Sequence, residues 1–204
     1  MSSRSILPAM RKSVALIALC LAAASAPASA GEITSAYTKY NLDKCKSLSS
    51  SVEESFGSFA CNGYKGLEIY FAEGDLRAFM AYGANGFEHC SAQQTFGHFN
   101  SVTPTVEWRL DNGRPFAAIQ RWNVSDLDDA SKTTSWLGVT KIENANSCRV
   151  AIIKGLLPRA NEKAREAADT LARGFNCQTD TALVISDEQI EAGQLMSGTP
   201  CGPE

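Results

Sequence analysis

Histidine is scarce in this chain, and the motifs of the best-known enzyme chemistries are missing. His89 and His98 are the only two histidines among 204 residues. The sequence contains no G-x-S-x-G, H-E-x-x-H, Walker or G-x-G-x-x-G pattern. These absences exclude the serine hydrolases, zinc peptidases and nucleotide-binding enzymes that such motifs identify. We therefore expect no catalytic residue, no cofactor and no metal ligand.

Long apolar runs are also missing, apart from a short one near the N-terminus. Residues 14–24 are apolar, follow two arginines and a lysine, and precede Ala28-Ser29-Ala30. A basic start, a short apolar stretch and a small-x-small site are typical of a secretory signal peptide. A bilayer needs roughly 20 apolar residues, so this stretch is too short to span it. We predict a signal peptide over 1–30, a single periplasmic or secreted domain over 31–204, and no membrane insertion after cleavage.

Positive charge is in deficit once the predicted signal peptide is removed. Residues 1–30 hold three of the 19 basic residues and none of the 22 acidic ones, which leaves 16 basic against 22 acidic side chains. An acidic domain repels the phosphate backbone of nucleic acids and anionic lipid surfaces. We expect neither of them as a partner.

Cysteine is comparatively frequent. One cysteine lies within the predicted signal peptide, and the remaining six predict three disulfides, out of fifteen possible pairings, in an exported chain. A strand begins at residue 148 and a helix of similar length follows it, so the chain returns to its starting point near residue 177. The expected pairs are Cys148–Cys177 from this geometry, Cys45–Cys61 because the two bracket a Ser- and Gly-rich loop, and Cys90–Cys201 by elimination.

Alternating segments predict two β-hairpins. Residues 67–82 alternate about an expected turn at Glu73-Gly74 and give one wholly apolar face. The opposite face of this hairpin holds Glu68, Tyr70, Arg77 and Phe79.

The second hairpin is predicted from Asn112-Gly113, the preferred pair for a type I′ turn. With an unbroken ladder on both sides of this turn, Trp108 shares a face with Ala117 and Ile119. Glu107, Arg109 and Trp122 then share the other face.

Two more strand-like runs, residues 135–142 and 148–154, are separated by the polar residues 143–146. Asn161 is expected to cap a helix in which alanines recur at helical spacing until Gly174. The tail from about residue 186 is expected to be loop-like. The predicted fold is a disulfide-stapled α+β domain, with a largely antiparallel sheet of five to six strands and one principal C-terminal helix packed on one face.

The most informative feature is a sheet face that mixes aromatic side chains with arginine. Arginine can bind carboxylates, and aromatic rings supply apolar contact area. The sequence therefore favours a binding or interaction module over an enzyme, with an unknown protein or cell-wall ligand as its partner. In the opposite interpretation the N-terminal segment or the tail covers this face, and Glu107 forms an ion pair with Arg109 or Arg77 inside a second small core. The candidate binding residues are Tyr70, Arg77, Phe79, Glu107, Arg109 and Trp122.

Two other functions stay open. A hydrolase would use Glu88, His89 and His98 as an acid–base site, although their spacing matches no metal motif. A purely structural envelope protein would need no site at all.

The mature chain contains the segments Tyr37-Thr38-Lys39, Leu42-Asp43-Lys44-Cys45, Cys61-Asn62-Gly63-Tyr64, Glu73-Gly74-Asp75-Leu76-Arg77, Glu107-Trp108-Arg109-Leu110, Arg114-Pro115-Phe116-Ala117, Arg121-Trp122, and the predicted helix from Ala164-Arg165-Glu166 to Phe175-Asn176-Cys177. Together these segments, which extend over most of the mature chain, resemble a group of uncharacterised exported proteins of rhizobia-like bacteria. The resemblance implies a periplasmic location. It implies no activity, because the matching segments are not catalytic motifs.

Overall fold

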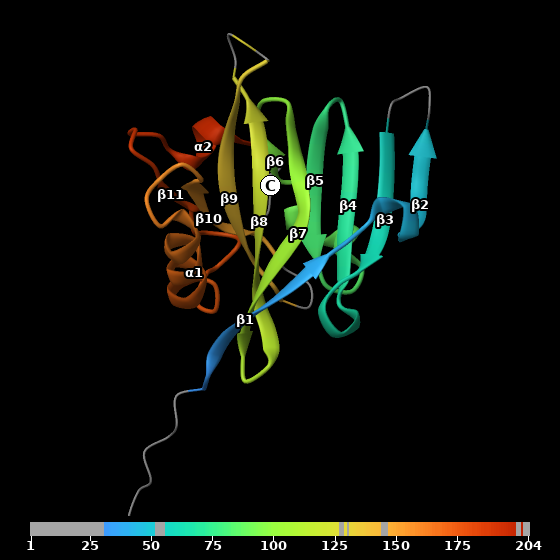
Figure 1. Cartoon of the computed structure of the whole chain (residues 1–204), viewed down its shortest axis with the longest axis horizontal. Coiled ribbons are helices and arrows are strands. Elements are labelled where there is room, and N and C mark those ends of the chain that lie inside the picture. Colours follow the sequence, from blue (N-terminus) through green and yellow to red (C-terminus); the bar gives the residue numbers. More distant parts are fainter. Residues whose placement is uncertain are drawn as a thin grey trace, which may run out of the picture. The chain divides into compact units, whose positions relative to one another are not determined.

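The computed structural model describes residues 31–51, 56–126, 129, 131–143, 147–198 and 201 (Figure 1). The predicted signal peptide lies outside these residues. About half of the described chain is β-strand, with few helices, and the predicted α+β class is confirmed. In these ranges, no helix is both long enough and apolar enough to cross a membrane.

The described ranges contain twelve strands. They are β1 (Ile33–Lys39), β2 (Lys46–Ser51), β3 (Phe56–Asn62), β4 (Glu68–Gly74), β5 (Arg77–Tyr82), β6 (Thr95–Phe96), β7 (Asn100–Asp111), β8 (Arg114–Ser125), β9 (Thr133–Lys141), β10 (Arg149–Lys154), β11 (Leu183–Ile185) and β12 (Met196–Ser197).

These strands form three sheets rather than the single sheet predicted. The larger sheet has six strands in the order β1-β7-β8-β9-β10-β11 and is antiparallel except for the β10–β11 pair. The smaller sheet has four antiparallel strands in the order β2-β3-β4-β5, and β6 pairs with β12. The prediction of five to six largely antiparallel strands therefore describes only the larger sheet.

The main core contains the apolar faces of both sheets. Trp108 and Trp122 come from the larger sheet, while Ile69, Met80 and Tyr82 come from the smaller one, and all five are fully buried. Burial of large aromatic and aliphatic side chains is the dominant favourable contribution to folding. The two sheets are thus joined by one shared core.

The helix α1 (Ala160–Leu171) packs on the other face of the larger sheet, as predicted. Its buried stripe of Ala164, Ala167 and Ala168 lets the helix backbone lie close to the strands. The predicted cap is wrong: the residue before the helix is Arg159, in the left-handed region at φ 58°. The side chain of Asn161 instead accepts a hydrogen bond from Arg121 of β8.

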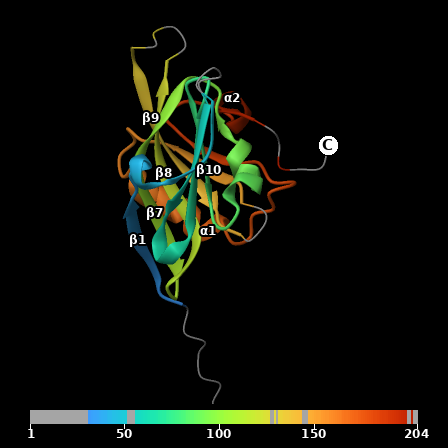
Figure 2. The ribbon, with the colours of Figure 1, turned by 90° about the vertical axis from the view of Figure 1, so that its right-hand side faces the viewer.

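Short 3-10 helices complete the fold. Two of them, η3 (Gly86–Glu88) and η4 (Cys90–Gln93), lie against β4 and β5 of the smaller sheet. Figure 2 shows this green segment on the side of the molecule away from β1. The other two are η1 (Leu42–Lys44), between β1 and β2, and η2 (Tyr64–Gly66), between β3 and β4.

The β7–β8 hairpin turns at Asn112-Gly113 as predicted, with positive φ at both residues. One residue later the ladder is irregular: Leu110 pairs with Pro115, but Arg109 pairs with Ala117. The bulge adds one residue on β8, and a one-residue slip moves every later side chain to the other face. The predicted face assignment for β8 is therefore wrong beyond the bulge.

The β4–β5 hairpin turns two residues later than predicted. Asp75 and Leu76 occupy the turn with φ values of 50° and 57°, and Gly74 pairs with Arg77. Because the displacement is even, the apolar and mixed faces keep their predicted members.

All three expected disulfides are present: Cys45–Cys61, Cys90–Cys201 and Cys148–Cys177. Three intramolecular disulfides are typical of an oxidising, extracytoplasmic compartment. The tail that was predicted to be loop-like contains a short helix, α2 (Ala192–Leu195), followed directly by β12. Ala192 is buried in the main core, so this tail is part of the packed domain.

Candidate functional site

The six predicted binding residues do not form one surface, because the structure divides them among three layers. Glu107 and Arg109 lie between the larger sheet and α1, whereas Trp122 lies between the two sheets. Tyr70 belongs to a small cluster on the outer face of the smaller sheet, where Phe79 also packs.

The charged pair on β7 is part of a network with α1. One edge of the Arg109 guanidinium, with Nε and Nη2, donates to the two carboxylate oxygens of Asp169 at 2.8 and 2.6 Å. Arg165 donates to Glu107 at 2.6 Å, and Ser35 bridges the two pairs through its hydroxyl. Bidentate charge-assisted bonds of this kind hold an element in place. Glu107 and Arg109 are therefore covered and ion-paired, as in the alternative interpretation, but the expected pair between Glu107 and an arginine of the same face is wrong, because both partners come from α1.

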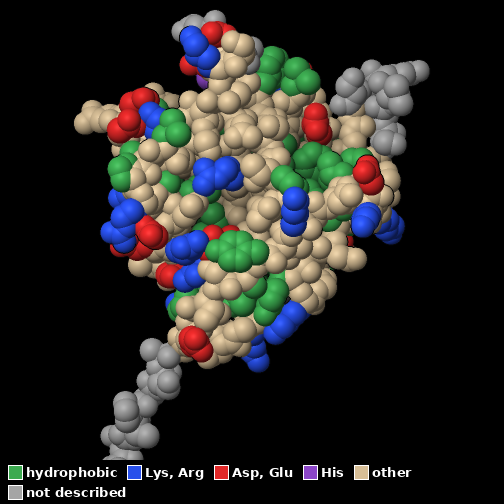
Figure 3. All heavy atoms as spheres, in the orientation of Figure 1, with side chains coloured by type: hydrophobic (Ala, Val, Ile, Leu, Met, Phe, Trp, Pro, Cys, Tyr) green, Lys and Arg blue, Asp and Glu red, His purple; other side chains and the backbone are tan. Residues whose placement is uncertain are grey.

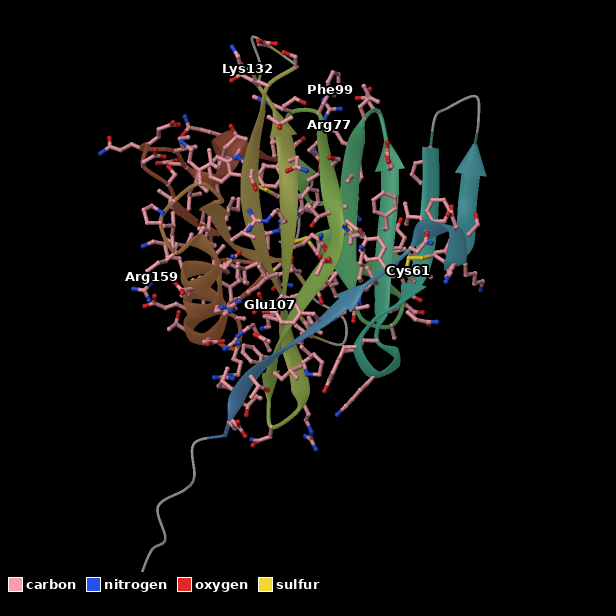
Figure 4. All side chains as sticks on the ribbon, viewed as in Figure 1. Cys61, Arg77, Phe99, Glu107, Lys132 and Arg159 are labelled. Carbon is pink, nitrogen blue, oxygen red and sulfur yellow. A yellow bond between two sulfur atoms is a disulfide. The ribbon has the colours of Figure 1, made fainter. Side chains whose placement is uncertain are left out.

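Arg77 lies at one end of β5 and is also engaged. Its Nε donates to the carbonyl of residue 97 at 3.2 Å, and its guanidinium lies 5.5 Å from the ring centre of Phe99. Figure 4 shows Arg77 beside Phe99 at one end of the sheets, with Glu107 in another part of the molecule. These charged residues therefore cannot act on one ligand together.

The two histidines are not brought together either. Nδ1 of His98 lies 3.2 Å from the carbonyl oxygen of Ser125, to which it donates in the tautomer protonated at Nδ1, close to Arg77 at the start of β5. His89 contacts Gly83, just beyond the last residue of β5. Strands rise about 3.3 Å per residue, so the two ends of β5 lie about 17 Å apart.

The environment of His89 is apolar and closed. Its side chain is buried in the turn between η3 and η4, bonds to the backbone of Ala84, and leaves Nδ1 without a partner. Burial lowers the pKa of His89, an effect that Glu88 and Glu68 partly oppose. Across the described ranges, no three His, Cys, Asp or Glu side chains gather as a metal site.

A different residue, which the sequence analysis did not select, has the most unusual environment in the protein. Arg149 begins β10, and its side chain is 3% exposed. The register of β10 against β9 shifts between Arg149 and Ala151. In a regular strand, residues two apart point to the same face, so Arg149 would lie on the α1 face with Ala151. The bulge reverses this, and the side chain of Arg149 points into the core between the two sheets.

Inside that core the guanidinium has an aromatic neighbour and no hydrogen-bond partner. Its carbon lies 4.8 Å from the ring centre of Trp122. None of its three nitrogens bonds to any residue that the structure describes, and the indole Nε1 of Trp122 has no partner either. We call these four nitrogens the donor cluster. All four carry N–H groups and none can accept, so the cluster is complementary to a group that only accepts.

Gly138 creates the space in which the donor cluster converges. A Cβ atom on this residue of β9 would lie 2.8 Å from Cζ of Arg149 and 3.0 Å from Nε1 of Trp122. Only a glycine therefore lets the arginine cross β9 and reach the indole.

Burial of the charged guanidinium costs free energy. It lowers the pKa of Arg149 to about 10, which still leaves the guanidinium charged at neutral pH. A desolvated cation–π contact contributes about 2 kcal/mol, whereas an unpaired buried ion costs several kcal/mol. The neighbouring polar side chains already have hydrogen-bond partners. The hydroxyl of Tyr82 donates to Gln120, whose amide donates to the backbone carbonyls of Thr103 and Thr105 at 2.5 and 3.3 Å.

Arg149 also lines a cavity of about 500 Å³ beside the C-terminal segment. Gln94 fixes one wall, because its Oε1 accepts from the backbone N–H of Arg149 and its Nε2 donates to Cys201. The walls combine apolar and neutral polar side chains with one carboxylate, that of Asp180, which accepts from the backbone N–H of Asn176 and the hydroxyl of Thr179. Besides Gln94 and Arg149 they include Phe175, Gln178, Thr181, Ala192, Met196 and Ser197.

One signal for this site is present in the sequence. In the segment Cys148-Arg149-Val150-Ala151-Ile152-Ile153, arginine is the single charged residue among apolar ones, before the strand ends at Lys154. A charge in such a strand needs a partner wherever it lies. Comparisons with models of protein families, with curated proteins and with solved structures found no match.

Proposed function

We propose that the mature chain is an exported binding domain that holds a small carboxylate ligand at the donor cluster. This keeps the binding role expected from the sequence and moves it from the mixed face to Arg149. The single observation that carries the proposal is a charged guanidinium, almost fully buried, whose three nitrogens have no partner among the described residues.

A carboxylate fits this cluster for two reasons. Its oxygens only accept hydrogen bonds, and a planar carboxylate matches the planar fork of a guanidinium in bidentate geometry. The indole N–H of Trp122 supplies a further donor. In a site removed from water such charge-assisted bonds are strong, and the ligand's negative charge would offset the cost of burying Arg149.

The cavity beside Arg149 supports a ligand of metabolite size. Its volume of about 500 Å³ falls within the usual range for small-molecule sites. Neutral polar groups such as Gln94, Gln178 and Ser197 would contact the rest of the ligand. The location remains a proposal too: the three disulfides support an oxidising compartment, and the predicted signal peptide supports export.

Thermal unfolding in matched sodium salts tests the proposal. Acetate, succinate, phosphate and chloride are compared at constant ionic strength, with wild type, Arg149→Met and the half-buried control Arg121→Met, whose guanidinium already bonds to Ser135 and Asn161. A ligand at 100 times its Kd stabilises the folded state by about 2.7 kcal/mol. We expect succinate or acetate to raise the Tm of wild type and Arg121→Met, and to leave Arg149→Met unchanged.

Two outcomes would overturn the proposal. If phosphate alone raises the Tm, the site binds anions but the carboxylate assignment is wrong. If no anion raises the Tm of wild type, the donor cluster binds none of them, and Arg149 only packs on Trp122, as in an envelope protein without a ligand.

A further inference from the structure

A second cavity lies beside the main core, where the chain leaves the larger sheet. β1 ends at Lys39, and the backbone N–H of Tyr40 then bonds to Pro104 of β7 as the chain turns toward η1. This leaves a cavity of about 500 Å³ between the two sheets. Its lining residues are Lys39, Tyr40, Asn41 and Leu42, with Phe71, Glu73 and Ala78 of the smaller sheet and Ser101, Val102 and Pro104 of β7.

The walls of this cavity are mainly apolar. Phe71 and Ala78 belong to the main core, and Leu42 and Val102 pack against it. Phe59 extends the apolar surface along the smaller sheet, with its ring centre 6.2 Å from that of Phe71. Figure 3 shows hydrophobic side chains gathered on this face over β3 and β4.

One polar group inside the cavity has no partner. Tyr40 is 7% exposed, and its hydroxyl makes no hydrogen bond to any residue that the structure describes. Burial raises the pKa of Tyr40 far above its usual range, so the hydroxyl stays protonated and can donate. The hydroxyl oxygen itself is not among the fully buried atoms without a partner, so it is accessible and can donate to a ligand oxygen.

Charge at the cavity is balanced. Lys39 and Glu73 are both exposed, and neither forms an ion pair within the described ranges. One cation and one anion at the mouth give no preference for either sign, and a charged group against apolar walls would lose its hydration.

We infer that this cavity binds a small uncharged molecule with an apolar body and one hydrogen-bond acceptor, which the Tyr40 hydroxyl contacts. The site is separate from the donor cluster and takes a different class of ligand. It holds or fails independently of the carboxylate site.

Acetophenone and ethylbenzene test the inference, because they have nearly the same shape and differ in one carbonyl oxygen. Each is titrated into the ¹⁵N-labelled mature protein while the amide signals of Tyr40, Ala78 and Val102 are followed by NMR. Tyr40→Phe removes only the hydroxyl. Tyr37→Phe is the matched control, since Tyr37 is 58% exposed and its hydroxyl bonds to Arg165.

We expect both probes to shift these three amides in wild type. Tyr40→Phe should weaken acetophenone about fivefold, the equivalent of one ordinary hydrogen bond, and leave ethylbenzene unchanged. Tyr37→Phe should change neither. Val102→Trp, which fills the cavity, should abolish binding of both probes while the protein keeps its dispersed spectrum.

The inference is wrong if neither probe shifts these amides, or if the shifts appear instead around Gln94 and Ser197. It is also wrong if Tyr40→Phe weakens both probes equally or neither of them, since the hydroxyl would then not contact the ligand.

Discussion

The guanidinium of Arg149 lies over the indole ring of Trp122, 4.8 Å from its centre, and both side chains pack against Gly138 with nitrogens that have no hydrogen-bond partner among the described residues. Three strands contribute to this arrangement: β10 supplies the arginine, β8 the indole and β9 the glycine. The bulge in β10 is what brings them together. A regular strand would have placed the arginine under α1.

Gly138→Ala tests the geometry of the donor cluster without removing any member of it. A methyl group at this position meets both Arg149 and Trp122, and overpacking of this kind costs about 1–3 kcal/mol. Urea unfolding should show that loss. Gly174→Ala is the control, because nothing lies within 4 Å of its Cβ position, and it should be neutral or slightly stabilising. Equal effects of the two substitutions would contradict the packing described for Gly138.

The bidentate pair between Arg109 and Asp169 should be a principal attachment of α1 to the sheet. Arg109→Met leaves a carboxylate without its partner, and we expect a loss of about 2–3 kcal/mol in urea unfolding, with strong coupling to Asp169→Asn in a double-mutant cycle. Arg159→Met breaks an exposed pair with Glu162 and should cost less than about 1 kcal/mol. If the two arginine variants lose the same free energy of unfolding, the network around Arg109 contributes no more stability than an exposed ion pair.

The protein should lose stability in mild acid because His89 is buried. Its pKa is lowered in the folded state, so the unfolded chain binds a proton first as the pH falls. The free energy of unfolding should therefore be fully present above about pH 6.5 and decline as the pH falls from there toward the lowered folded pKa. His89→Gln should flatten this part of the profile, whereas His98→Gln should retain it. An unchanged profile in His89→Gln would show that His89 is already accessible to protons.

The disulfides should differ in their contributions. Cys90–Cys201 spans 111 residues and Cys45–Cys61 spans 16, for which chain entropy alone predicts about 4.7 and about 3 kcal/mol. Paired Cys→Ala replacement at each bridge, followed by urea unfolding, measures both values. The reverse order would mean that native contacts, rather than loop closure, dominate the comparison.

The same long-range bridge should also control access to Arg149. The C-terminal segment beside the cavity is held by the two-residue strand β12, one further backbone bond from residue 97 to Leu195, and Cys90–Cys201. In the variant without that disulfide, hydrogen exchange at Met196 and Ser197 should accelerate. The association rate of the carboxylate should rise in the same variant. Faster exchange without faster association would place the entry path elsewhere.

Turn and helix chemistry were predictable from the sequence where local residues determine them. Asn112-Gly113 marked its hairpin because both positions need positive φ, and the alanine stripe marked α1. The β4–β5 turn was misplaced because Leu76 adopts the left-handed region, which leucine rarely does, and no local residue signals it. Its side chain is 61% exposed, so packing does not reveal the turn either.

Bulges explain most of the remaining differences. A single irregularity beside Arg109 exchanged the faces of β8, so Trp122 moved from the predicted mixed face into the core. A second one, in β10, turned Arg149 inward. Tertiary packing selects such bulges, and neither has a marker in the surrounding residues. The disulfide pairs were predictable because geometry and elimination need only the approximate order of the elements.

The most direct measurement of the central claim is the indole N–H signal of Trp122 in a ¹H–¹⁵N spectrum during titration with sodium succinate. Trp108 serves as an internal control, because its Nε1 already donates to Thr38 at 3.0 Å. If the donor cluster binds carboxylates, the Trp122 signal shifts and saturates, the Trp108 signal stays in place, and Arg149→Met abolishes the shift. A Trp122 signal that does not respond to succinate, or that responds equally in Arg149→Met, would contradict the account.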